Sequence, residues 1–235
     1  MIKELNMIKN DESSLKEVIK KYNLKPKKKL GQNFLHDKNI ISSIIKKAKV
    51  ENENIIEIGP GPGILTEKIL KEKAKSLLVI EKDQSFESNL KKIKNDYQEN
   101  FNYLIHDVLD FDFNQLTNND FKIISNLPYN ISVPFILKMV KNQKIIPWKE
   151  MILMVQKEVA ERILAKIGTK TYGRLSLMVN LKNNVTKILD VKPSSFIPRP
   201  KVDSTVIKIT PNPKYTLVDD EIFEKIVKIC FSQRR

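Results

Sequence analysis

Apolar residues in this chain gather in short runs that alternate with stretches of helical spacing. Five runs rich in Ile, Leu, Val and Phe predict strands at 54–58, 76–80, 101–105, 121–125 and 151–155. Between them, helical patterns cover 64–72, 85–95, 131–141 and 157–166. Nearly continuous apolar strands separated by helices predict a parallel sheet that is covered by helices on both faces.

The two ends of the chain differ from this alternating middle. Helices are predicted over 11–22 and, with Asp37 as the cap, through about Val50. Two later strand candidates, 175–182 and 204–210, follow without a helix of comparable length and predict an antiparallel hairpin at one sheet edge. The predicted fold class is therefore α/β, with seven strands in a mainly parallel sheet that has an antiparallel edge strand.

The last segment, 218–235, carries apolar side chains on a helical period and ends without a capping glycine. A single helix with so much apolar surface needs partners that the remaining sequence does not supply. We therefore expect this helix to be the beginning of a region that has been cut short.

The length and composition of the chain limit the classes of protein to which it can belong. The chain has 235 residues, of which 41% are hydrophobic and 30% charged, as is typical of a folded globular protein. No apolar run approaches the roughly 18 residues of a membrane span, and residues 1–25 lack the apolar core of a signal peptide. The single cysteine, Cys230, fits a reducing compartment, so we expect a cytoplasmic protein without a membrane partner.

The charge balance is strongly basic. Forty-two Lys and Arg residues against 28 Asp and Glu residues give a formal net charge of +14. Such an excess favours a polyanionic partner and predicts salt-sensitive nucleic-acid binding. A lysine-rich chain encoded by AT-rich DNA would show the same excess, so charge alone leaves the partner open.

A glycine-rich loop, Gly59-Pro60-Gly61-Pro62-Gly63, lies between the first strand and the next helix. Its G-x-G-x-G spacing differs from the patterns of dinucleotide sites and phosphate loops. The two prolines also remove N–H donors that a bound phosphate would need. These features favour S-adenosylmethionine, an adenosine cofactor without phosphate, and Glu57 would complement its positive charge.

Acidic residues close the next two strands. Glu81 stands where a carboxylate binds both ribose hydroxyls, and Asp107 stands where a carboxylate can accept from the adenine amine. Either acid alone is more often a helix cap. Because parallel strands end at the same edge of a sheet, the two acids and the glycine loop together predict one cofactor crevice.

The fourth strand ends in the predicted catalytic tetrapeptide, Asn126-Leu127-Pro128-Tyr129. An exocyclic adenine amine is a poor nucleophile because its lone pair is delocalised into the ring. The Asn126 side-chain oxygen and a backbone carbonyl would accept from its N–H groups and direct the lone pair at the methyl sulfonium. Pro128 stiffens the loop, and Tyr129 offers a ring on which an extruded base can stack. Transfer then depends mainly on proximity, without a general base.

In this order, the motifs resemble those of the KsgA-type (RsmA-type) ribosomal RNA adenine dimethyltransferases over roughly 24–235. The glycine loop and the tetrapeptide carry the resemblance, together with 31–35 (GQNFL), 156–160 (QKEVA), 172–176 (YGRLS) and 196–204 (FIPRPKVDS). The resemblance implies a Rossmann-like class I S-adenosylmethionine-dependent methyltransferase domain at 25–212. An N-terminal helical extension would precede it at 1–24, and the start of a truncated, small helical C-terminal domain would follow at 213–235.

The same resemblance implies an activity and a set of site residues. The protein would dimethylate N6 of two adjacent adenosines in the 3′-terminal hairpin of small-subunit (16S) rRNA on the pre-30S subunit, late in its assembly, as a monomer. Tyr129 would stack on the target base, and Phe196 would cover its other side. The cofactor-binding residues would be Asn33, Leu35, Gly59, Gly61, Glu81, Asp107 and Asn126.

Basic residues near these motifs are candidate contacts to RNA phosphates, namely Lys27, Lys28, Lys29, Arg199 and Lys201. His36 and His106 are far apart and lack metal-ligand spacing, so no metal is predicted. Two alternatives stay open. One is an erythromycin-resistance-type adenine methyltransferase of 23S rRNA, and the other is an RNA-binding ribosome-assembly factor in which catalysis is secondary.

Overall fold

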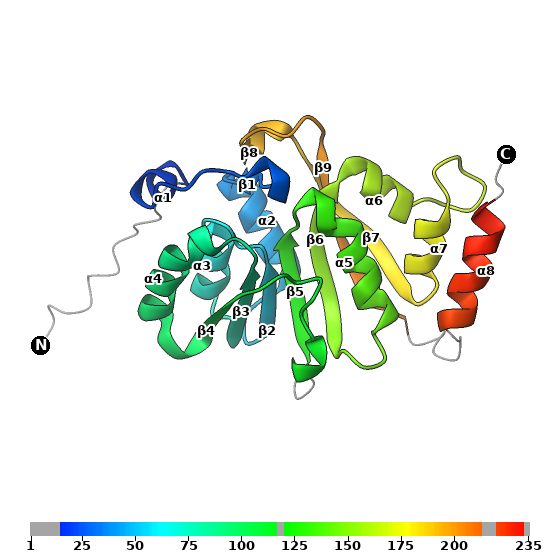
Figure 1. Cartoon of the computed structure of the whole chain (residues 1–235), viewed down its shortest axis with the longest axis horizontal. Coiled ribbons are helices and arrows are strands. Elements are labelled where there is room, and N and C mark those ends of the chain that lie inside the picture. Colours follow the sequence, from blue (N-terminus) through cyan, green and yellow to red (C-terminus); the bar gives the residue numbers. More distant parts are fainter. Residues whose placement is uncertain (1–14, 117–119, 213–219, 233–235) are drawn as a thin grey trace, which may run out of the picture.

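The computed structural model describes residues 15–116, 120–212 and 220–232, without the side chains of Lys16, Lys28 and Asp220 (Figure 1). The helices are α1 (Leu15–Lys21), α2 (Lys38–Ala48), α3 (Ile64–Lys71), α4 (Glu87–Tyr97), α5 (Tyr129–Lys141), α6 (Lys157–Ile163), α7 (Arg174–Asn180) and α8 (Asp220–Ser232). The strands are β1 (Phe34–Leu35), β2 (Asn54–Ile58), β3 (Ser76–Glu81), β4 (Phe101–Ile105), β5 (Phe121–Asn126), β6 (Trp148–Gln156), β7 (Asn183–Val191), β8 (Phe196–Ile197) and β9 (Ser204–Pro211).

Seven of these strands form one sheet in the order β4-β3-β2-β5-β6-β9-β7. The first five run parallel. Strand β9 runs antiparallel to both of its neighbours, which are β6 and the edge strand β7. The predicted α/β fold class, with a mainly parallel seven-stranded sheet and an antiparallel edge strand, is confirmed. Strands β1 and β8 form a separate two-stranded sheet.

The prediction of a strand at 175–182 is wrong. Most of this segment lies in helix α7, and the edge strand β7 begins only at Asn183. Ser176 fixes the start of the helix, because its hydroxyl accepts from the Gly173 N–H and donates to the Arg162 carbonyl. Leu175 and Val179, four residues apart, then bury one face of the helix.

Alternate residues of the strands supply two hydrophobic cores, one on each face of the sheet. Ile55, Ile124 and Ile152 pack in the core that also contains buried residues of α2, α3 and α4. Their neighbours Ile56, Ile123 and Leu153 face the opposite way, into the core formed with α5, α6 and α7. Successive side chains of a strand point to opposite faces of the sheet, and here both faces are covered by a core. These strands therefore need apolar residues at nearly every position.

Helices α1 and α8 lie at opposite ends of the molecule (Figure 1). Leu15 and Val18 of α1 are buried in the same core as α2 and α3. Helix α8 packs beside α7, where Glu224 pairs with Arg174 at 2.9 Å and with Lys141 of α5 at 3.4 Å. None of the described helices is long and apolar enough to span a membrane.

Candidate functional site

One cleft opens at the carboxyl edge of the parallel strands, where β2 and β5 lie side by side but are far apart in sequence. The chain leaves β2 toward β3 and β4 and then returns to β5 on the other side, which is the point where open α/β sheets bind ligands. The cleft is lined by all of the predicted cofactor and tetrapeptide residues, Asn33, Leu35, Gly59, Gly61, Glu81, Asp107, Asn126, Leu127, Pro128 and Tyr129.

Glu81 organises the cofactor side of the cleft. One of its oxygens accepts from the Gly61 N–H at 3.1 Å, and the other accepts from the Asp83 N–H at 2.8 Å. Gly61 has a φ of +53°, and a Cβ there would lie 3.2 Å from ring atoms of Phe34. The loop therefore needs glycine at this position to fit beneath Phe34. The Glu81 carboxylate joins this loop to the turn that follows β3.

The lining of the cleft suits a ligand without phosphate. Three carboxyl groups, those of Glu57, Glu81 and Asp107, face a single lysine among the residues that line it. That lysine, Lys82, is ion-paired with Asp107, whose other oxygen accepts from the Leu109 N–H. Burial alone would raise the pKa of Asp107, but the hydrogen bond and charge of Lys82 lower it, so this carboxylate is ionised.

The protonation state of Glu57 differs from the negative charge that the sequence suggested. Glu57 is almost fully buried, and its side chain accepts a hydrogen bond from the Thr66 hydroxyl at 2.7 Å. Burial, opposed by the Thr66 hydrogen bond and assisted by the nearby Glu81, raises the pKa of the Glu57 carboxyl to about 8. Glu57 is therefore mainly neutral at pH 7, and a bound cation would favour its ionised form.

This buried carboxyl predicts a specific pH dependence of folding. The unfolded Glu57 loses its proton near pH 4.5, whereas the folded one keeps it until about pH 8. Between these values the unfolded state binds fewer protons, so the free energy of unfolding falls as pH rises, by up to about 1.4 kcal/mol per unit from this group. Urea unfolding at pH 5, 6.5 and 8 should show a flatter profile for Glu57→Gln. Parallel profiles for the two proteins would contradict the raised pKa.

Asn126 is held in a defined orientation by a segment from the N-terminal side of the chain, residues 27–33, which we call the strap. The Asn126 side-chain amide donates to the Asn33 carbonyl at 2.9 Å. This bond uses the amide nitrogen and leaves the Asn126 side-chain oxygen without a hydrogen bond to any described residue. The tetrapeptide therefore presents an acceptor to the cleft.

Tyr129 stands at the start of α5, half-buried in the wall of the cleft. Its hydroxyl lies 2.7 Å from the Ser204 hydroxyl at the start of β9, which holds the ring in place. Phe196 differs from the prediction, because it does not line the cleft. Its side chain is fully buried, and its strand pairs with β1 opposite Leu35. Phe196 is thus a core residue that supports β1, and in this arrangement its side chain does not face the cleft.

The candidate RNA contacts divide into two groups. The Lys27 side chain is exposed, but its amine pairs with the buried carboxylate of Asp83 at 2.6 Å. Lys29, Arg199 and Lys201 are exposed, as phosphate contacts must be. The side chain of Lys28 lies outside the described part of the structure.

Sequence reasoning missed three residues that shape this site. Lys82 and Asp83 belong to no quoted motif, and Ser204 lies in the 196–204 motif without a predicted role. Their roles arise from contacts with residues at least 25 positions away along the chain. Within the described residues, no group of three or more His, Cys, Asp or Glu side chains is arranged to hold a metal ion.

Comparison with known proteins gives consistent matches over nearly the whole chain. The family model for ribosomal RNA adenine dimethylase matches residues 23–235. The chain is 41% identical over 214 residues to Ribosomal RNA small subunit methyltransferase A of Pelagibacter ubique, covering 90% of this chain and 80% of the relative. It is 42% identical over 228 residues to the protein of the same name from Alkaliphilus oremlandii, covering 94% and 78%.

A solved structure supports the same likeness. The crystal structure of a dimethyladenosine transferase from Plasmodium falciparum superimposes with a TM-score of 0.76 at 34% identity, covering 86% of this chain and 72% of that chain.

Proposed function

Because this chain belongs to the ribosomal RNA adenine dimethylase family, we propose that it dimethylates two adjacent adenosines in the 3′-terminal hairpin of small-subunit rRNA. It is an S-adenosylmethionine-dependent rRNA adenine dimethyltransferase. The choice of adenosines, the substrate particle and the site residues belong to the proposal. We take the substrate to be the pre-30S subunit late in its assembly and the enzyme to act as a cytoplasmic monomer.

The observation that supports the proposed site best is the hydrogen bond from Asn126 to the Asn33 carbonyl. It fixes the amide so that its oxygen is the atom offered to a ligand in the cleft. An adenine N6 amine has two N–H donors, and this oxygen suits one of them. Across the cleft lie the glycine loop, Glu81 and Asp107, which we assign to the cofactor.

We assign the second N–H of the amine to the Leu127 carbonyl. The carbonyls that follow it are engaged, because Pro128 accepts from the Ile131 N–H and Tyr129 accepts from the Ser132 hydroxyl. With both N–H groups held, the nitrogen lone pair is turned out of the ring plane. S-adenosylmethionine supplies an electrophilic methyl group on a positively charged sulfur. The residues of the chain bring the amine to it and stack the base on Tyr129.

The cofactor side of the site fits S-adenosylmethionine on three counts. Glu81 and Asp107 both line the cleft, and we assign Glu81 to the ribose hydroxyls and Asp107 to the adenine amine. The prolines of the loop leave few N–H donors for a phosphate. The exposed side chains of Lys29, Arg199 and Lys201 would then contact RNA phosphates around the mouth of the cleft.

Mass spectrometry of ribosomal RNA tests the proposed function directly. Small subunits lacking the modification should gain four methyl groups on two adjacent adenosines of the 3′-terminal hairpin when incubated with the protein and S-adenosylmethionine. Large subunits, incubated in parallel, should gain none. Methylation of large-subunit RNA instead would favour the erythromycin-resistance type. Cofactor binding without transfer to any ribosomal particle would favour an assembly factor.

A further inference from the structure

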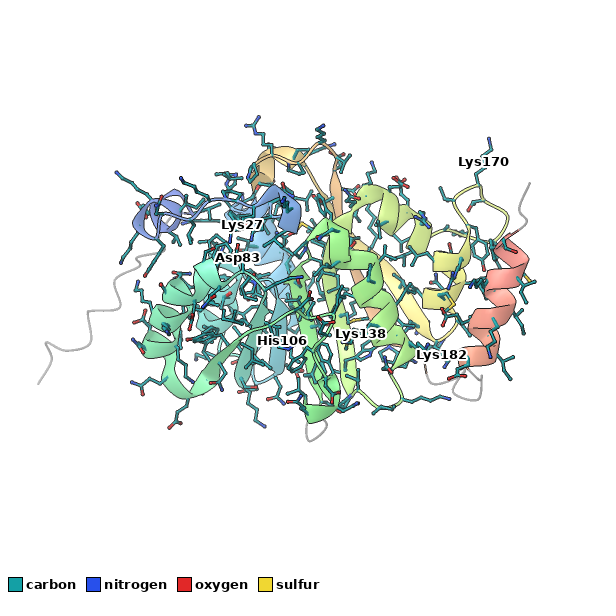
Figure 2. The ribbon with its side chains drawn as sticks, in the orientation of Figure 1. Lys27, Asp83, His106, Lys138, Lys170 and Lys182 are labelled. Carbon is teal, nitrogen blue, oxygen red and sulfur yellow. The ribbon has the colours of Figure 1, made fainter. Side chains whose placement is uncertain are left out.

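Asp83, in the turn after β3, collects four hydrogen-bond donors on one buried carboxylate. Two come from its own turn, the N–H of Ser85 at 3.0 Å and the Ser85 hydroxyl at 2.7 Å. The other two come from the strap, the Lys27 amine at 2.6 Å and the Gln32 side-chain amide at 2.8 Å. The Asp83 side chain is 1% exposed. Lys27 and Asp83 lie next to each other in Figure 2.

The strap is closed on itself at the same place. The side-chain oxygen of Gln32 accepts from the Lys27 backbone N–H at 2.7 Å, so the Gln32 amide is used at both of its ends. Burial alone would raise the pKa of Asp83, but the hydrogen bonds from Lys27, Ser85 and Gln32 lower it to about 2. The carboxylate is therefore ionised at any working pH, and the bonds to it are charge-assisted.

The strap touches both sides of the cleft. At one end it is tied to Asp83, whose N–H donates to Glu81, the residue assigned to the ribose. At the other end the Asn33 carbonyl accepts from Asn126, the residue assigned to the target amine. Gly31 lies between them, so close to Asn130 that a Cβ would come within 2.9 Å of its side-chain oxygen. The strap therefore crosses the cleft between the two halves of the site.

From these contacts we infer that Lys27, Gln32 and Asp83 form a clasp that fastens the strap over the bound cofactor. Asp83 is a positioning residue, because it acts through the strap and does not itself line the cleft. The clasp slows the departure of the cofactor, and through Asn33 it keeps the Asn126 amide oriented. The charge of Lys27 serves this ion pair and not an RNA phosphate. The inference rests on the proposed function for the identity of the cofactor.

The test is the dissociation rate of S-adenosylhomocysteine, measured by stopped-flow displacement, with its affinity from titration calorimetry. Asp83→Asn removes the charge, and its new NH₂ group opposes a donor of the strap. We expect dissociation at least about tenfold faster, since a tenfold change corresponds to about 1.4 kcal/mol, within the range of one charge-assisted bond. Phe34, the first residue of β1 directly after the strap, still packs edge-to-face on Phe86 at 5.7 Å between ring centroids, so an apolar contact between β1 and the segment after β3 is retained.

Lys27→Met removes the strap's side of the ion pair, and it tests the clasp even if the Asp83 variant folds poorly. It should speed dissociation severalfold, and Lys27→Arg should restore most of the wild-type rate. The double variant should be little worse than Asp83→Asn alone, because both changes break the same contact. Lys25→Met is the matched control, since Lys25 is an exposed neighbour with the same charge and should leave dissociation unchanged.

The outcomes separate the clasp from the proposed function. If the wild-type protein fails to bind S-adenosylhomocysteine or S-adenosylmethionine, the assigned cofactor site is wrong. If it binds them and Asp83→Asn and Lys27→Met release the ligand at the wild-type rate, only the clasp is overturned. A Lys27→Met protein that keeps the wild-type rate but loses more affinity for small-subunit rRNA than Lys25→Met would show that Lys27 is a phosphate contact after all.

Discussion

Replacing Asn126 with alanine should lower the rate of methyl transfer to rRNA by about 10²–10³-fold, by analogy with the removal of one preorganised hydrogen-bonding group from an active site. The Asn126 oxygen is the acceptor that the cleft offers to the target amine, and its position is fixed by the bond from the same amide to Asn33. A water molecule at that position would be neither oriented nor held. Transfer of labelled methyl groups to unmethylated small subunits, under single-turnover conditions, measures the effect.

Cofactor binding should survive this change in moderately weakened form, which separates a defect in transfer from a defect in loading. Asn126→Asp is the informative companion, because it keeps an acceptor but loses the donor to the Asn33 carbonyl and sets a carboxylate against it. We expect it to be nearly as inactive as alanine. Asn142→Ala, at the other end of α5, removes a comparable side-chain amide and serves as the control. Full activity in Asn126→Ala would contradict the proposed role of Asn126 in holding the target amine.

The strongly periodic middle of the chain could be predicted because local pattern and tertiary burial agree there. Strands β2, β3, β5 and β6 are largely buried on both faces, so their sequences are nearly continuous apolar runs that fit few other structures. The helix caps also follow local chemistry, as at Asp37, whose side chain accepts from the N–H groups of Asn39 and Ile40.

The last part of the sheet could not be predicted in the same way. Strand β7 is an edge strand, and most of its residues are half-buried or exposed, so it lacks an apolar run. The segment before it does have such a run, but it belongs to α7, where Leu175 and Val179 pack on one side of a helix. A short apolar run fits either structure, and the choice is made by contacts with α5 and α6.

The site shows the same division between local and distant information. The glycine loop, Glu81, Asp107 and Asn126 could be placed together because parallel strands end at one edge. The contacts of Lys27 with Asp83 and of Phe196 with β1 could not be predicted, because these partners lie far along the chain. A lysine that pairs with a buried carboxylate looks the same in sequence as one that faces solvent.

The second large effect is expected at Glu81. Replacing it with alanine should raise the dissociation constant for S-adenosylmethionine about a hundredfold, because two hydrogen bonds from the ribose hydroxyls to a carboxylate are worth about 3 kcal/mol together. The change also strips the N–H groups of Gly61 and Asp83 of their acceptor, which loosens the glycine loop and the turn that holds the strap. Titration calorimetry at fixed pH measures the constant.

Glu81→Gln tests which of these two effects dominates. Its oxygen can still accept from one backbone N–H, but its NH₂ group faces the other donor, so one of the two anchors must break. We therefore expect glutamine to lose most of the affinity that alanine loses. Glu87→Gln is the matched control, since Glu87 forms a surface ion pair with Lys91 and does not line the cleft. If Glu81→Gln bound the cofactor as tightly as the wild-type protein, neither the charge nor the double anchoring of Glu81 would be needed for binding.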